Sequence, residues 1–374
     1  MKMAHLDTAL ITAAERGPAP GFVAMASLPD GQQYLRAFGR RGIATAEPMT
    51  ADSLFWVASF TKLVTSIVAL QLIEEGRLSL DQTVASILPD FADLPILEGF
   101  DEAGAPRLRR ASDAPTIRHL LTHTSGCGYA FMDADLARWG EHTGAGISEG
   151  RSQPRVFDAD SRWQYGVSSE WLGTAIEAVT GEDLETAFQR RIFAPLGMAD
   201  TALAPGAALT ARAAQMHARL PDGSLAPMEF SLPPPPHFSM GGGGLYSTAP
   251  DFMRLLRALL DAEILTAASR AALFDNRVGE LEAGVLASSI AAFTNPFDPL
   301  PGQPKRWSLG MMINSQPVAG GRAAGSGAWA GLANCYYWAD PANGVAGILL
   351  SQVLPFADPE ILSLFSTFER AVYA

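Results

Sequence analysis

Apolar residues dominate the stretch at residues 53–76 and recur there at helical spacing. Leucine, isoleucine and valine occupy positions 63, 64, 67, 68, 70 and 72, and Gly76 follows as a stop signal. This pattern predicts a helix over residues 59–75. Because almost every residue after its first turn is apolar, we expect the helix to be buried on all sides.

Strand patterns lie at both ends of the chain, and helical patterns lie between them. Strands are expected at 21–28, 32–38, 306–314, 332–340 and 345–353, and helices at 169–180, 184–193 and 358–373. The predicted fold class is α+β. Its antiparallel sheet is built from both termini and flanked by helices (residues 1–80 with 237–374), with a mostly helical domain inserted (residues 81–236). A cleft between the two is the expected ligand site.

Composition narrows the classes of partner. The 374 residues are 48% hydrophobic, which supports a large core. Their net charge of −12 argues against nucleic acid and anionic membranes, and favours a small-molecule ligand. We see neither an apolar run of membrane-spanning length nor a secretion signal, and expect a cytoplasmic protein. Cys127 and Cys335 stand too far apart in sequence to indicate a disulfide framework or a zinc site.

Ser59 and Lys62 are the first candidates for chemistry. One helical turn separates them, so their side chains are expected to share a face of the predicted helix. A serine hydroxyl is a weak nucleophile until a base takes its proton, and S-x-x-K is an arrangement in which lysine does so. The alternative is that Ser59 is an ordinary N-cap.

Three other motifs are weaker. The G-x-S-x-G match at 146–150 has polar, glycine-punctuated residues before it instead of a strand, so we interpret it as a loop. His119 and His123 have zinc-helix spacing, but Leu120 stands where a metalloprotease needs Glu, and structural hydrogen bonds are the preferred interpretation. Gly241 to Gly244 lack the Lys of a phosphate loop and favour close backbone packing.

Taken together, the motifs resemble one family. Ser59 to Lys62 (SFTK), residues 120–126 (LLTHTSG), Tyr165, residues 195–201 (PLGMADT) and residues 242–249 (GGGLYSTA) are similar, in this order, to segments of serine β-lactamase-like proteins of the class C and penicillin-binding type. Residues 329–331 (WAG) resemble the W-G-G of their family VIII carboxylesterase branch.

The resemblance implies roles for particular residues. Ser59 is the expected nucleophile, with Lys62 and Tyr165 as the proton-transfer pair. The backbone N–H groups of Ser59 and Leu332 are the expected oxyanion donors, because the small residues at 325–331 would let a substrate lie along the strand edge.

Five further residues are candidates for substrate binding. Tyr129 and Glu170 are expected at the pocket by resemblance, with a solvent-exposed helix start as the alternative for Glu170. Trp329 is either a pocket wall or a core aromatic. Gly331 and His237 complete this set.

The expected function is hydrolysis of short-chain carboxylic esters through an acyl-enzyme, with no metal or organic cofactor. The chain has Trp329 where β-lactamases have the Lys of K-T-G, and Val167 where they have Asn, and both differences favour a simple ester over a β-lactam. Acyl transfer, residual β-lactam or D-amino-acid peptide cleavage, and a catalytically silent binding module remain alternatives. The oligomeric state stays open, with a homo-oligomer among the alternatives.

Overall fold

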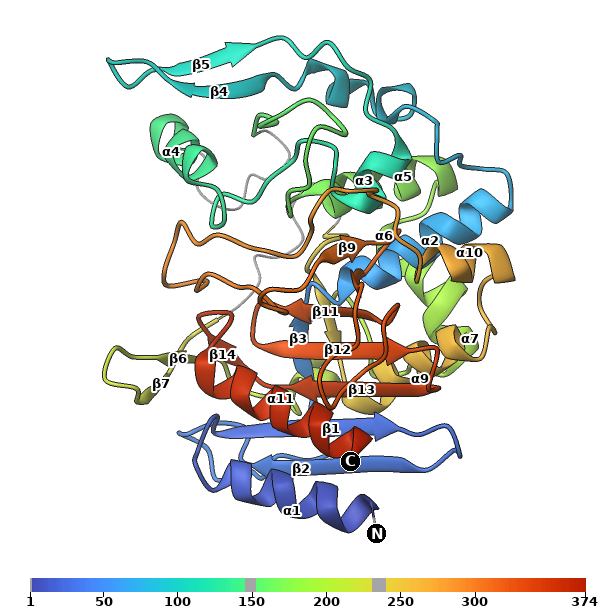
Figure 1. Ribbon diagram of the computed structural model, residues 1–374. Helices are drawn as coiled ribbons and strands as arrows, with labels where there is room; N and C mark the ends of the chain where they lie inside the picture. Colours follow the sequence, from blue (N-terminus) through green and yellow to red (C-terminus); the bar gives the residue numbers. More distant parts are fainter. Residues whose placement is uncertain (1, 145–152, 231–239) are drawn as a thin grey trace.

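A seven-stranded antiparallel sheet forms the centre of the molecule (Figure 1), seen in a computed structural model that describes residues 2–144, 153–230 and 240–374. Both chain ends build this sheet, so the predicted fold class is confirmed. In spatial order the strands are β2 (Gln33–Gly39), β1 (Gly21–Ser27), β13 (Val345–Leu350), β12 (Cys335–Asp340), β11 (Gly327–Gly331), β10 (Met312–Asn314) and β9 (Lys305–Trp307).

Three strand predictions were wrong in their limits. The strand expected at 345–353 ends at Leu350, and Val353–Leu354 form a separate strand, β14, in a different sheet. The strand expected at 306–314 is two short strands, β9 and β10, separated by a turn in which the Ser308 hydroxyl accepts hydrogen bonds from the backbone of Gly310 and Met311. The strand expected from Leu332 begins only at Cys335. The intervening residues form a turn in which Asn334 has a φ of 59°, outside the extended range of a strand.

Side chains of β12 show which elements cover each face of the sheet. Successive residues of a strand point to opposite faces. Trp338 packs against Phe365 and Phe368 of α11 (Pro359–Tyr373), and α1 (Lys2–Ala14) packs beside that helix. Tyr337, one residue earlier, contacts Phe60 and Phe252, so α9 (Ala249–Leu260) and the start of α2 (Thr61–Glu74) cover the other face.

The predicted central helix is α2, and its start differs from the prediction. The helix begins at Thr61, two residues later than expected, and Phe60 occupies the N-cap position without a side-chain cap bond. Ser59 therefore lies in the turn before the helix and is not its N-cap. Eleven of the fourteen helical residues are buried, as the apolar pattern predicts.

Further helices and small sheets complete the described part of the chain. The helix predicted at 184–193 is a continuous helical segment. It consists of α6 (Leu184–Phe188), a π-helical turn η3 (Gln189–Phe193) and α7 (Ala194–Leu196). The other helices are α3 (Ile117–Thr122), α4 (Ala134–Thr143), α5 (Ser168–Thr180), α8 (Ala207–Thr210), α10 (Ala267–Ala272) and the 3₁₀ turns η1 (Val84–Ser86) and η2 (Pro89–Asp93). Small sheets pair β3 (Phe55–Ala58) with β8 (Leu245–Ser247), β4 (Ile96–Phe100) with β5 (Pro106–Arg109), and β6 (His217–Arg219) with β7 (Leu225–Pro227) and β14 (Val353–Leu354).

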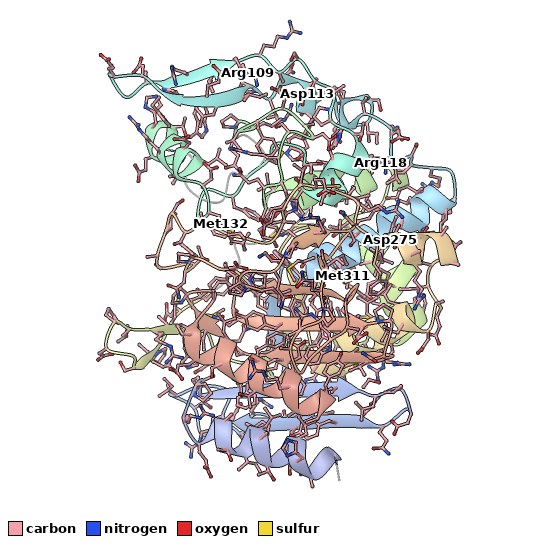
Figure 2. The ribbon with its side chains drawn as sticks, in the orientation of Figure 1. Arg109, Asp113, Arg118, Met132, Asp275 and Met311 are labelled. Atoms are coloured by element: carbon pink, nitrogen blue, oxygen red, sulfur yellow. The ribbon has the colours of Figure 1, made fainter. Side chains whose placement is uncertain are left out.

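A buried ion pair ties the β4–β5 hairpin region to the loop that leads to the site. Arg155 donates to both carboxylate oxygens of Asp113, at 2.8 and 2.6 Å, and its Nε donates to the Ser125 carbonyl at 2.7 Å. Figure 2 labels Asp113 near this hairpin. Burial works to raise the pKa of Asp113, but the bonds and charge of Arg155, together with the hydrogen bond from the Ala159 N–H, outweigh burial and lower that pKa, so the carboxylate stays charged.

Some expectations lie beyond what the fold tests. The G-x-S-x-G match at 146–150 and His237 fall outside the described residues. The domain boundaries at residues 80 and 236 stay a prediction. Among the described helices, none combines the length and the hydrophobicity needed to cross a bilayer.

Gly347 offers a test of the sheet packing. A Cβ at this position would lie 2.0 to 2.4 Å from three ring atoms of Trp338, its cross-strand neighbour. We expect Gly347→Ala to lower the free energy of unfolding by about 3 kcal/mol, because neither strand can move without breaking the sheet. Denaturant unfolding measures the change.

The matched control is Gly206→Ala. Gly206, at the N-cap of α8, has a φ of −70° and open space where a Cβ would be added. Alanine is a weaker N-cap than glycine but restricts the unfolded chain, so the two effects oppose each other and the replacement should change stability by less than about 1 kcal/mol. Equal effects of the two substitutions would contradict the packing described for Trp338.

Candidate active site

The turn between β3 and α2 positions Ser59. Ala58, the last residue of β3, has a φ of 46°, a left-handed conformation that costs an L-residue about 1 kcal/mol. This conformation ends the strand and turns the chain directly into the helix. Phe60 holds the turn in place, since its ring packs 4.6 Å from the ring of Phe252 and 4.8 Å from that of Tyr337. Ser59 is left half-buried at the floor of a cavity.

Lys62 is buried, with 1% of its surface exposed, and its amine is surrounded by oxygen atoms. Nζ lies 2.7 Å from the carbonyl oxygen of Gly242 and 2.9 Å from the hydroxyl of Tyr129. Its third contact is Ser59 Oγ, at 3.3 Å. Burying an amine without such acceptors would be costly, so these contacts define the place of the lysine.

Tyr129 connects Lys62 to a carboxylate. Its hydroxyl donates to Glu170 Oε1 at 2.6 Å while accepting from Lys62. Glu170 is 8% exposed and is not the exposed helix-start residue of the alternative interpretation. Its carboxyl group lies against Gly242, where a Cβ would come within 2.4 Å of it. Oε2 of Glu170 has no hydrogen-bond partner among the described residues.

Tyr165 approaches the same amine from another direction. Its ring centroid lies 4.6 Å from Lys62 Nζ, and its hydroxyl oxygen accepts a hydrogen bond of 2.9 Å from Trp329 Nε1. The ring of His123 packs 5.0 Å from the Tyr165 ring. Burial, with the nearby charge of Lys62, lowers the pKa of His123 well below its usual range, so the imidazole is neutral at pH 7.

A close backbone approach brings Leu332 to the serine. A Cβ at Gly331 would lie 2.3 Å from the carbonyl oxygen of Val57, so only glycine lets the end of β11 pack this tightly on β3. Leu332, the next residue, lines the same cavity as Ser59. This location is compatible with the predicted pair of oxyanion donors.

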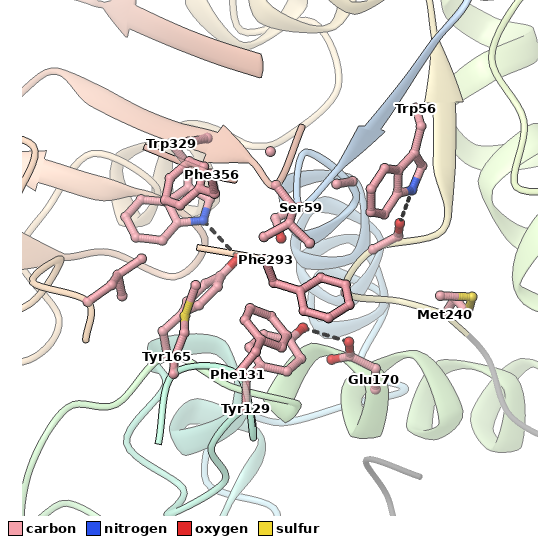
Figure 3. Close-up of a pocket in the computed structure, with 18 of the residues that line it drawn as sticks. Trp56, Ser59, Tyr129, Phe131, Tyr165, Glu170, Met240, Phe293, Trp329 and Phe356 are labelled. Atoms are coloured by element: carbon pink, nitrogen blue, oxygen red, sulfur yellow. Dashed lines mark hydrogen bonds between the residues drawn. The ribbon is translucent and has the colours of Figure 1, made fainter. Parts of the chain in front are cut away.

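The cavity above Ser59 has a volume of about 320 Å³, and its walls are mainly apolar (Figure 3). Trp56, whose Nε1 donates to the Gly243 carbonyl at 2.7 Å, contacts Phe230 on one wall. Apart from residues already named, the apolar lining consists of Phe131, Met132, Met240, Leu286, Phe293 and Phe356.

The structure thus brings together Ser59, Lys62, Tyr165, Leu332 and the other predicted site residues that it describes: Tyr129, Glu170, Trp329 and Gly331. It also adds something the sequence analysis missed. Tyr129, expected only as a pocket wall, contacts Lys62 directly. The aromatic lining was missed as well, because its residues come from separate loops and share no spacing that could have linked them.

Comparison with known proteins now places the chain. A family model described as Beta-lactamase matches residues 6–364. The chain belongs to the Beta-lactamase family. Over an alignment of 395 positions, the chain is 35% identical to monacolin J acid methylbutanoyltransferase of Aspergillus terreus. The alignment covers 99% of this chain and 95% of the relative. The chain is 30% identical to lovastatin esterase of Penicillium rubens, covering 98% of each.

Solved structures agree with the fold. Unliganded simvastatin synthase (LovD) from Aspergillus terreus superposes with a TM-score of 0.86 at 31% identity, covering all of this chain and 98% of the other. EstCE1, described as a hydrolase with promiscuous acyltransferase activity, has a TM-score of 0.77 at 21% identity and shares the fold, covering 100% and 99%. The chain is therefore of the serine hydrolase and acyltransferase type, and the narrower family VIII assignment stays a prediction.

The contact with Glu170 has a consequence for the titration of Tyr129. Burial and the neighbouring carboxylate raise the pKa of this phenol well above its usual range. An ordinary tyrosine is half ionised at about pH 10. We expect the ultraviolet difference spectrum between wild type and Tyr129→Phe to show no phenolate signal at about pH 10.

The same comparison in guanidinium chloride is the control, because unfolding removes both causes. There the signal of one half-ionised tyrosine should appear at about pH 10. Its appearance in the native protein would mean that Tyr129 is not held by Glu170 as described.

Proposed function

We propose that the protein forms an acyl-enzyme on Ser59 and transfers the acyl group to the hydroxyl of an alcohol, with transfer to water as the competing fate. The observation that carries the proposal is the contact of the buried Lys62 amine with Ser59 Oγ at the floor of an apolar cavity. Relatives that carry the names of acyltransferases and of an esterase support both fates, and the acyltransferases are more numerous among them.

The contacts of Lys62 favour its action as a base. A neutral amine has two N–H donors and one lone pair. The Gly242 carbonyl can only accept, and the Tyr129 hydroxyl accepts because its own proton goes to Glu170. In the neutral form of the amine both donors would be used by these two acceptors, which leaves the lone pair for the hydroxyl of Ser59, the third contact of Nζ. Attack of Oγ on the acyl carbon then passes the hydroxyl proton to Nζ.

Tyr165 is the proposed proton donor to the leaving group. Because indole can only donate, the bond from Trp329 makes the Tyr165 oxygen an acceptor and leaves its own O–H free to point into the cavity. The phenol gives its proton to the departing oxygen, and the resulting phenolate is stabilised by the Lys62 ammonium, which lies 4.6 Å from the ring centroid. In the second half the alcohol gives its proton to this phenolate, and Ser59 leaves with the proton that Lys62 took from it.

The charge of the site limits the substrate. Lys62 has its donors occupied, and the described lining residues include no arginine, histidine or other lysine. A β-lactam or a D-amino-acid peptide carries a carboxylate, which would find no cation to bind and would meet Glu170. We therefore propose an uncharged, apolar acyl donor, with the backbone N–H groups of Ser59 and Leu332 stabilising the oxyanion.

Replacement of the nucleophile tests this mechanism. We expect Ser59→Ala to abolish release of p-nitrophenol from p-nitrophenyl butyrate, with kcat lower on the order of 10³-fold or more. In wild type, added 1-butanol should divert the acyl group, so that butyl butyrate forms at the expense of butyrate. Mass spectrometry of the products measures the division.

Ser66→Ala is the matched control, since Ser66 lies about two turns after Ser59, in α2, buried and away from the cavity lining. It should keep most of the wild-type rate. An active Ser59→Ala enzyme would refute the nucleophile, whereas an active wild type that forms only butyrate at every butanol concentration would leave hydrolysis as the function.

Trp329→Phe tests the orientation of Tyr165. The substitution keeps an aromatic ring at this position of β11 but removes the N–H group that donates to Tyr165. We expect kcat to fall about tenfold, equivalent to about 1.4 kcal/mol, while KM for p-nitrophenyl butyrate changes far less. An effect on KM alone would instead make Trp329 only a wall of the pocket.

A further inference from the structure

A second cavity lies directly behind the active one. It has a volume of about 220 Å³ and is formed by the far side of β11 and β12, the segment around Phe297 and one side of α11. Trp329 and Ala330 line both cavities, so their separation at β11 is a single strand thick. The walls of the second cavity include the apolar residues Tyr336, Leu362 and Phe365, together with Asp298 and the ion pair of Arg322 with Glu369.

The ring of Phe356 separates the two spaces beyond the strand. Phe356 lines the active cavity, yet its ring centroid lies 4.9 Å from that of Phe297 and 6.2 Å from that of Tyr336, both walls of the second cavity. The backbone N–H of Phe356 donates a hydrogen bond to the Phe293 carbonyl, and its carbonyl accepts one from the Asn295 N–H. These backbone hydrogen bonds do not involve the Phe356 ring. Phe356 is thus a wall of the active cavity that contacts two walls of the second one.

The position of Phe356 indicates which part of a substrate it meets. In Figure 3, Phe356, Trp329 and Tyr165 lie on one side of Ser59, and Trp56 and Met240 on the other. The group that exchanges protons with Tyr165 is the oxygen of the alcohol. The alcohol therefore extends along the Trp329 side toward Phe356, and the acyl chain extends toward Trp56.

We propose that the second cavity is a closed extension of the alcohol site, and that Phe356 sets the length of the alcohol the enzyme uses. This inference rests on the proposed function. Its chemistry is apolar burial: alkyl alcohols that reach Phe356 must stop there, and a smaller residue would let the chain continue among Phe297, Tyr336 and Leu362.

The test compares 1-butanol with 1-decanol as acceptors of the butyryl group from p-nitrophenyl butyrate. We expect Phe356→Ala to raise the kcat/KM ratio of decanol to butanol about tenfold or more over wild type. Phe356→Leu, which disturbs the core less, should give a smaller increase and serves if the alanine variant folds poorly. Adding Leu362→Trp fills the second cavity from α11 and should return the ratio toward the wild-type value.

Two results would overturn the proposal. One is an unchanged decanol-to-butanol ratio of kcat/KM in Phe356→Ala and Phe356→Leu enzymes that release the first equivalent of p-nitrophenol normally. The other is a gain for p-nitrophenyl decanoate over butyrate without a gain for decanol, which would place the acyl chain at Phe356. If wild type transfers to no alcohol, hydrolysis of decyl and butyl butyrate makes the same comparison, because their alcohol portions occupy the same side. Failure of transfer is thereby separated from failure of the cavity assignment.

Discussion

A lysine amine buried at the start of α2 is the constraint on which the site depends. An amine that is 1% exposed needs oxygen acceptors, and three segments far apart in the sequence supply them: the turn at Ser59, the loop at Tyr129 and the glycine run at Gly242. Satisfying Lys62 therefore assembles the site. The Gly242 carbonyl and the Tyr129 hydroxyl accept two hydrogen bonds from the amine, and the third contact of Nζ is the Ser59 hydroxyl.

Missing side chains matter as much as present ones. Gly242 leaves room for the Glu170 carboxyl, and Gly331 lets β11 approach the carbonyl of Val57. At either position a Cβ would collide with the neighbouring segment, so glycine is what allows the two segments to touch beside the catalytic candidates. Rigid backbone of this kind can hold reacting groups in place without reorganisation during a reaction.

The chemistry that this arrangement supports follows from its polarity. The polar groups converge on the Ser59 hydroxyl, whereas the rest of the cavity is aromatic or aliphatic. Such walls suit the neutral acyl donor and the apolar alcohol that we propose. In that proposal water competes with the alcohol for the acyl group. Relatives named for acyl transfer and for ester hydrolysis support the two proposed fates of the acyl group, transfer to an alcohol and transfer to water.

The amino-acid sequence by itself determined the buried helix, the strands at both termini and the pairing of Ser59 with Lys62, because periodicity and short spacing are local properties. It also indicated Tyr165, Tyr129, Glu170 and Leu332, through motifs in a recognisable order. Only the tertiary structure decided that Tyr129 contacts Lys62, that Trp329 donates to Tyr165, and that Phe356 lines the cavity. Those contacts join residues more than 60 positions apart, and such distances are decided by how the sheet, the helices and the loops pack, which no local pattern encodes.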